Sequence, residues 1–198
     1  MEFIAHRINT IEELKEVPLE YGVELDLRDH GDRLILQHDP FKDGEDFEEY
    51  LKRYNHGTMI LNIKSERIEH KVLELIRKYN IQKYFFLDSS FPMIRLLSKD
   101  GEKNMALRFS EFEGLDTILT MAGKVDWVWV DCFTKLPITT EIFTTLKQKG
   151  FKLCLVSPEL QGQGEKLEEY GQYLYDNKIV FDAICTKSYN VPQWDKLL

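Results

Sequence analysis

The stretch TMILNIKSERIEHKVLELIRKYNIQKYFFLDS (residues 58–89) holds two short apolar runs with an amphipathic segment between them. The runs at 58–64 and 83–89 have the length and composition of buried strands. The segment at 66–80 predicts a helix, because four apolar residues fall on one of its faces: Ile68, Val72, Leu75 and Ile76. A strand, a helix and a second strand in this order form the unit that joins neighbouring parallel strands.

The same alternation continues along the whole chain. Six further strand-like runs lie at 2–7, 22–27, 105–110, 126–131, 151–157 and 181–187. Further helical patterns lie at 10–21, 44–54, 92–100, 114–123, 140–150 and 165–177. Eight strands alternating with helices predict an α/β fold, and eight such units close a (β/α)8 TIM barrel. An open doubly wound sheet is the alternative, but no GxGxxG follows the first strand.

Composition and charge narrow the class of protein. The 198 residues are 43% hydrophobic, and no Pro-, Gly- or Ser-rich linker divides them, so we expect a single domain over 1–198. A net charge of -8 argues against nucleic-acid binding, which needs clustered Lys and Arg. No apolar segment is long enough to span a membrane. Cys132, Cys154 and Cys185 form no CxxC pair, which predicts buried thiols in a reducing, cytoplasmic compartment.

Polar residues end nearly every predicted strand. In GVELDL (22–27), Glu24 and Asp26 alternate with apolar residues and therefore share one face of the strand. Asn62 and Lys64 share a face of LNIK in the same way. The apolar set must meet the helices, so these four polar side chains should point to the barrel axis. The carboxyl ends of barrel strands are where such folds hold their active sites.

A polar turn at 28–33 and a second short apolar run, LILQHD (34–39), follow the strand at 22–27. This pattern predicts a strand extension or hairpin that brings His38 back over the barrel mouth. Two buried carboxylates need compensation by a divalent cation, by a Lys or Arg side chain, or by both, and their hard oxygen ligands suit Mg²⁺ or Ca²⁺. His6 and His38 could divide the roles of general acid and base, because imidazoles titrate near neutral pH.

Taken together, IAHR, GVELDL, LILQHD and LNIK resemble the glycerophosphodiester phosphodiesterase family, which belongs with the phosphatidylinositol-specific phospholipase C-like phosphodiesterases. The resemblance spans the chain and is most specific over residues 3–64. It implies a metal-assisted hydrolysis of phosphodiesters in which a neighbouring substrate hydroxyl attacks phosphorus first and gives a cyclic phosphate. The implied roles are general acid and base for His6 and His38, metal ligation for Glu24, Asp26 and Asn62, and phosphate binding for Arg7 and Lys64, with Arg108 and Lys187 as further anion-binding candidates.

The chain departs from the family pattern in three places. Ile8 replaces the usual Gly after His-Arg, and the first loop is short. Asn62 stands where the family commonly has a third acidic metal ligand, so metal binding should weaken unless another acid such as Asp88 substitutes. Only 18 residues separate Asp39 from Thr58, so the insertion that usually covers the active site is missing.

These departures leave the substrate open. A more open mouth could accept a small or a polymeric phosphodiester. Two alternatives to the metal-assisted enzyme follow: a degenerate barrel that binds a phosphorylated ligand without turnover, and a metal-independent phosphodiesterase or lyase in which Arg28 or Lys64 supplies the positive charge.

Overall fold

Eight parallel strands form the centre of the computed structural model, which describes residues 1–198. They are β1 (Glu2–Ala5), β2 (Gly22–His30), β5 (Met59–Ile63), β6 (Tyr84–Leu87), β7 (Ala106–Phe109), β8 (Trp127–Val130), β9 (Lys152–Val156) and β10 (Ala183–Thr186). Each lies within one of the eight runs predicted from the sequence, or extends it at one end. The prediction of an α/β fold is therefore confirmed.

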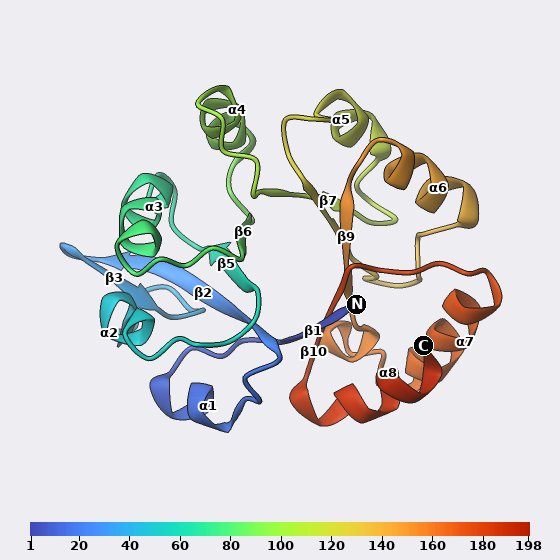
Figure 1. Cartoon of the computed structure of the whole chain (residues 1–198), viewed down its shortest axis with the longest axis horizontal. Helices are drawn as coiled ribbons and strands as arrows, with labels where there is room; N and C mark the ends of the chain where they lie inside the picture. The colour runs from blue at the N-terminus through green and yellow to red at the C-terminus, as the bar shows by residue number, and fades with distance from the viewer.

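The eight strands neighbour one another in chain order, and β10 returns to pair with β1. The sheet is thus curled, with helices around its outside (Figure 1). Its two edge strands, β6 and β7, meet through a single isolated bridge between Phe86 and Met105. The other pairs are longer, and β2 and β5 align over five residues. The join between β6 and β7, called the seam below, is therefore the weakest in the sheet.

Eight helices accompany the strands, seven between successive strands and one after the last. They are α1 (Ile11–Glu16), α2 (Phe47–Leu51), α3 (Glu69–Lys78), α4 (Phe91–Lys99), α5 (Leu115–Thr120), α6 (Thr140–Gln148), α7 (Leu167–Asp176) and α8 (Val191–Leu197). Thr10 and Glu13 cap α1 reciprocally, as their spacing predicts, and α1 ends just before Pro18. The short α8 was not predicted. None of the helices combines the length and the apolar character needed to cross a membrane.

The predicted hairpin is confirmed. Strand β2 continues to His30, turns, and pairs antiparallel with β3 (Arg33–Leu36), which in turn pairs with β4 (Glu45–Asp46). The hairpin projects from the ring of strands at the left of Figure 1. Leu36 lies opposite Leu27, so the chain that leaves β3 returns to the carboxyl end of β2. This return places His38 beside the other strand ends.

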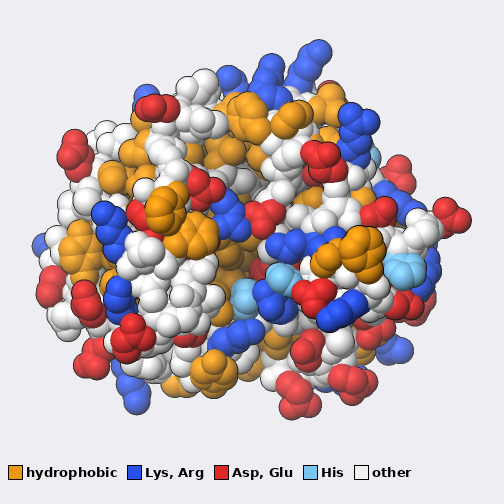
Figure 2. All heavy atoms as spheres, turned by 180° about the vertical axis from the view of Figure 1, so that it is seen from behind, with side chains coloured by type: hydrophobic (Ala, Val, Ile, Leu, Met, Phe, Trp, Pro, Cys, Tyr) orange, Lys and Arg blue, Asp and Glu red, His pale blue; other side chains and the backbone are white.

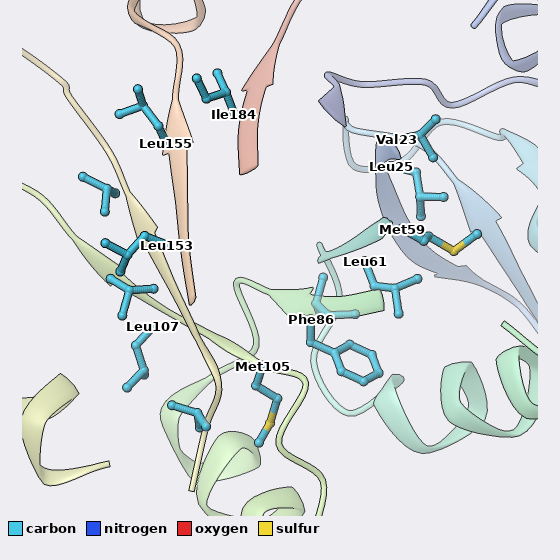
Figure 3. Close-up of a cluster of buried hydrophobic side chains, with 14 of the residues drawn as sticks. Val23, Leu25, Met59, Leu61, Phe86, Met105, Leu107, Leu153, Leu155 and Ile184 are labelled. Atoms are coloured by element: carbon cyan, nitrogen blue, oxygen red, sulfur yellow. The ribbon is translucent and has the colours of Figure 1, made fainter. Parts of the chain in front are cut away.

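Alternation along the strands separates two apolar layers. The outer layer lies between strands and helices, and Figure 3 shows side chains that several strands contribute to it, among them Leu25, Leu61 and Phe86. The inner layer is a smaller cluster inside the sheet, with Ile60 and Trp129 among its members. Glu24 and Asp26 alternate with the outward-facing Leu25 and are buried. They therefore lie on the inner face, as the sequence pattern predicts.

Candidate active site

Polar side chains from β1, β2 and β5 meet at the carboxyl ends of these strands. His6 and Arg7 directly follow β1, which pairs with β2. Asp26 on β2 is in register with Asn62 on β5, and Lys64 follows β5. The structure thus brings together the residues that the sequence singled out on three neighbouring strands.

Glu24 lies at the bottom of this cluster and is 1% exposed. One carboxylate oxygen accepts a 2.7 Å hydrogen bond from Asn62 Nδ2, and the other accepts a 2.8 Å bond from the Arg7 backbone N–H. Burial, together with repulsion from Asp26, raises the pKa of Glu24 to about 7. The carboxyl group therefore takes up a proton readily unless a cation approaches it.

Asp26 is held by Asn9, a residue that the sequence pattern did not single out. Asn9 Nδ2 donates a 2.8 Å bond to Asp26 Oδ2, and the Asp26 N–H donates a 2.8 Å bond to Asn9 Oδ1. Two cations also lie near this carboxylate: Arg7 Nε at 3.6 Å from Oδ2 and Lys64 Nζ at 3.6 Å from Oδ1. The two-point contact fixes the orientation of Asp26, whereas the cations balance its charge only in part.

The oxygens of Glu24, Asp26 and Asn62 fit a hard divalent cation. Asn62 is buried, and its Oδ1 has no hydrogen-bond partner. A buried carbonyl oxygen without a partner is costly, and ligation of a cation would satisfy it. No group of three or more His, Cys, Asp or Glu side chains is arranged to hold a metal ion. A cation placed here could take a third side-chain ligand only from the amide of Asn62, and the three side chains carry two negative charges rather than three.

His6 lies beside the carboxylates, with Nε2 3.8 Å from Glu24 Oε2. Burial is the main cause that lowers its pKa to about 3, and the charges of Lys187, Arg7, His38 and Lys64 lower it further. The imidazole is therefore neutral at physiological pH and able to accept a proton. Its buried Nδ1 has no partner, and Lys187 Nζ donates to the His6 carbonyl oxygen at 3.3 Å.

His38 faces His6 from the returning hairpin, close enough for its charge to affect the pKa of His6. Its Nδ1 lies 2.9 Å from Asp39 Oδ1, and Lys42 contacts the other oxygen of Asp39 at 2.8 Å. The hydrogen bonds from Lys42 and His38 lower the pKa of Asp39 to about 2. An ionised Asp39 orients the ring of His38 through this contact.

Arg28 anchors this hairpin to β5. Its guanidinium donates to the carbonyl oxygen of His38 at 2.9 and 3.2 Å and to that of Lys64 at 3.0 Å. All three of its nitrogens are therefore engaged by the backbone. The hypothesis that Arg28 supplies charge to a bound phosphate is not supported by this placement, whereas Lys64 keeps its ammonium inside the cluster.

Arg108 lies across the seam between β6 and β7. It binds both oxygens of Asp88, at 2.7 and 3.1 Å, and Asp131 Oδ2 at 2.7 Å. Asp88 also accepts from Lys64 at 3.3 Å, so its two oxygens are already occupied. The proposed substitution of Asp88 for a third metal ligand would require this ion pair to open. An anion-binding role for Arg108 would likewise have to compete with two carboxylates.

Glu159, which the sequence pattern also did not single out, supports the last strand. It accepts hydrogen bonds from Ser157 and Thr186 Oγ1 and, at 3.1 Å, from the Lys187 N–H. Trp194 of α8 donates to Ser157 Oγ at 2.7 Å. This network fixes the backbone from which Lys187 extends toward His6. Thr186 and Lys187 lie 27 and 28 positions from Glu159, so no local signal indicated these contacts.

Comparison with known proteins identifies the fold. No protein-family model matches the chain, and no curated protein does. A candidate glycerophosphodiester phosphodiesterase from Galdieria sulphuraria superposes with a TM-score of 0.71 at 17% identity, covering 99% of this chain and 97% of its own. The chain shares the fold of glycerophosphodiester phosphodiesterases.

Two further solved structures described as glycerophosphodiester phosphodiesterases agree. The enzyme from Thermotoga maritima has a TM-score of 0.64 at 18% identity and covers 99% of this chain and 97% of its own. That from Agrobacterium tumefaciens has a TM-score of 0.66 at 15% identity and covers 93% and 96%. At these identities the likeness establishes the architecture, and the chemistry must be argued from the side chains.

Proposed function

We propose that the protein is a phosphodiester hydrolase of the glycerophosphodiester phosphodiesterase family. The observation that carries this proposal is the placement of His6 at the strand ends, with Nε2 3.8 Å from the buried Glu24 and with His38 close enough to influence its pKa. A neutral imidazole and a carboxylate-supported imidazole supply the base and the acid that cleavage of a phosphodiester requires.

In the first step, His6 accepts the proton of a substrate hydroxyl next to the phosphodiester, and that oxygen attacks phosphorus. His38 donates a proton to the departing alkoxide, which leaves as the alcohol. The product is a cyclic phosphate, and water then opens it with the two histidines in exchanged roles. The lowered pKa keeps His6 neutral, which is the form that a general base requires, and the contact of His38 with Asp39 orients the ring that would act as the acid.

Cationic side chains would bind the phosphoryl oxygens. Arg7 and Lys64 flank Asp26, and Lys187 lies against His6. Of the two that flank Asp26, Arg7 has the more exposed side chain, at 44% against 18% for Lys64. We assign the first contact with the substrate to Arg7 and the deeper one to Lys64.

A divalent cation, Mg²⁺ or Ca²⁺, would lie against Glu24, Asp26 and the Oδ1 of Asn62. When bound, it would neutralise charge on the phosphoryl oxygens. Binding would also keep Glu24 ionised, because burial and the charge of Asp26 raise its pKa and a cation would oppose both effects. The residues therefore support a metal site of modest affinity.

The strands support a compact (β/α)8 barrel that lacks the usual covering insertion. Between Asp39 and β5 the chain forms only the short β4 and α2. An uncovered mouth would admit a small or a polymeric phosphodiester. The three cysteines are buried and unpaired, which supports the expectation of a reducing, cytoplasmic compartment.

Phosphorus NMR of the protein with glycerophosphodiesters, in Mg²⁺, in Ca²⁺ and in chelator, tests the proposal. We expect a phosphomonoester or cyclic phosphate to appear with metal, and His6→Ala and His38→Ala each to slow turnover by about 10²–10⁴-fold. His56→Ala is the control, because His56 contacts the Val17 carbonyl away from the site. Ligand binding with full recovery of the diester would instead identify a non-catalytic barrel, and chelator-resistant turnover would identify a metal-independent enzyme.

A further inference from the structure

Exposed phenylalanines surround the mouth of the sheet. Four phenylalanines are exposed in the chain: Phe41, Phe91, Phe112 and Phe133. Each lies in the loop or helix start that follows a strand on the side of the candidate active site, after β3, β6, β7 and β8 respectively. Tyr189, also exposed, follows β10. Phenylalanine is usually buried, and all the exposed phenylalanines lie at this end of the strands. Their exposure therefore indicates an interaction surface at this end.

Phe41 is the most exposed of these side chains, and no neighbouring residue covers it. Its φ of 63° lies in the left-handed region, which a bulky residue rarely adopts. On the opposite side of the mouth, Phe112 and Phe133 lie with ring centroids 6.1 Å apart. The aromatic side chains are thus distributed around the mouth instead of forming one patch.

The centre of the same face is polar and basic. Arg7 is well exposed there and Lys64 lies deeper, whereas Glu24 and Asp26 lie beneath and are 1% exposed. Figure 2 shows basic, acidic and histidine side chains near the middle of this face, with hydrophobic groups on either side. Protein–protein interfaces have the reverse arrangement, with an apolar centre and a polar rim. This pattern argues against a protein as the partner.

A phospholipid surface matches both parts of the pattern. Aromatic rings insert at the boundary between headgroups and acyl chains, while cations at the centre meet headgroup phosphates. We infer that the mouth of the sheet docks on a phospholipid surface through Phe41, Phe112, Phe133 and their neighbours. The identity of the substrate rests on the proposed function. With that function, the substrate is a phosphodiester that the lipid surface presents to the site.

Co-sedimentation with phosphatidylcholine vesicles tests the docking without any need for turnover. We expect wild-type protein to sediment with the vesicles in high salt, because apolar insertion is not screened. Phe41→Ser and Phe112→Ser should each lower the partition coefficient by about tenfold. Leu19→Ser and Val180→Ser remove exposed apolar side chains at the opposite end of the strands and should change nothing.

Three outcomes would overturn the inference. The first is that the wild-type protein does not sediment with vesicles. The second is that the control variants lose as much vesicle binding as Phe41→Ser and Phe112→Ser. The third is that the wild type forms a dimer in lipid-free ultracentrifugation and Phe41→Ser is a monomer. Hydrolysis rates of two substrates separate docking from catalysis. One substrate is a lysophospholipid mixed into the vesicles, and the other is a soluble glycerophosphodiester. Phe41→Ser should slow hydrolysis of the lysophospholipid and leave hydrolysis of the soluble substrate unchanged. Turnover of neither substrate, with intact vesicle binding, would reject the proposed function and leave the docking surface standing.

Discussion

Asn62 donates a 2.7 Å hydrogen bond to Glu24, and this bond leaves the other end of its amide, Oδ1, buried without a partner. The contact joins two neighbouring strands where a third acidic ligand is expected from the family resemblance. An amide at this position satisfies one carboxylate in the absence of metal. It also removes one of the charges that would attract the metal.

A third carboxylate at position 62 should make the stability of the protein depend more strongly on bound metal. In Asn62→Asp, three carboxylates lie together, so the metal-free protein should melt at a lower temperature than the wild type. Saturating Mg²⁺ or Ca²⁺ should reverse the difference, with metal affinity raised by about tenfold or more. Thermal unfolding with and without metal, and calorimetric titration, measure both effects. Equal melting temperatures in chelator would contradict the close approach of this side chain to Glu24.

Glu24 should make stability depend on pH in the absence of metal. Its pKa is raised to about 7, whereas the unfolded value is 4.5. Below pH 4.5 both states hold the proton, and as pH rises toward 7 only the folded state keeps it. The free energy of unfolding should therefore fall over this interval, by about 3 kcal/mol at most.

Glu24→Gln is the matched variant for this measurement, because it keeps the shape and cannot titrate. His6, whose pKa is lowered, contributes in the opposite direction in both proteins, since stability from this residue rises with pH up to about 6.5. The difference between wild type and variant isolates Glu24. Urea unfolding in chelator at several pH values provides it, and a pH-independent difference would show that Glu24 titrates normally.

Asn9 should act as a positioning residue for Asp26. Asn9→Ala removes two 2.8 Å hydrogen bonds, one of them to a buried carboxylate. We expect a loss of about 1–3 kcal/mol in unfolding free energy and a 10- to 100-fold weaker metal affinity. Asn55→Ala, at an exposed position, is the control. Unchanged metal affinity in a destabilised Asn9→Ala protein would limit Asn9 to a structural role.

Arg108 should stabilise the seam more than it binds substrate. Arg108→Met leaves Asp88 and the buried Asp131 without their shared partner, which should cost about 1.5–3 kcal/mol. The exposed pair of Arg33 and Asp43 gives the comparison, and Arg33→Met should destabilise the protein much less than Arg108→Met. Denaturant unfolding measures both. A large rise in KM for the phosphodiester in Arg108→Met would restore the phosphate-binding role.

Local patterns in the sequence predicted the strands and the inner face of β2. Alternation over a few residues decides which side chains point inward, so Glu24 and Asp26 could be placed without the structure. The hairpin was predictable because its polar turn separates two apolar runs. The seven-residue α8 was not, since it is too short to show a helical period and begins beside a proline.

Contacts between distant segments could not be predicted in this way. Asn9 reaches Asp26 across 17 positions, and Glu159 reaches Thr186 across 27. The ion pair of Arg108 was missed for the same reason, because its charge suggested an anion ligand until Asp88 and Asp131 were placed beside it. The roles of the site residues stay predictions that the experiments above test.

The strands form two halves that are joined at two places, and the two joins differ in length. The half from β1 to β6 joins the half from β7 to β10 firmly at β1 and β10, which align over four residues. It joins weakly at Phe86 and Met105. Partial unfolding would therefore begin on the side of Asp88 and Arg108, and His6 and Lys187 would move together on the firm side. The proposed acid and base therefore stand on the securely paired side of the sheet, away from the seam.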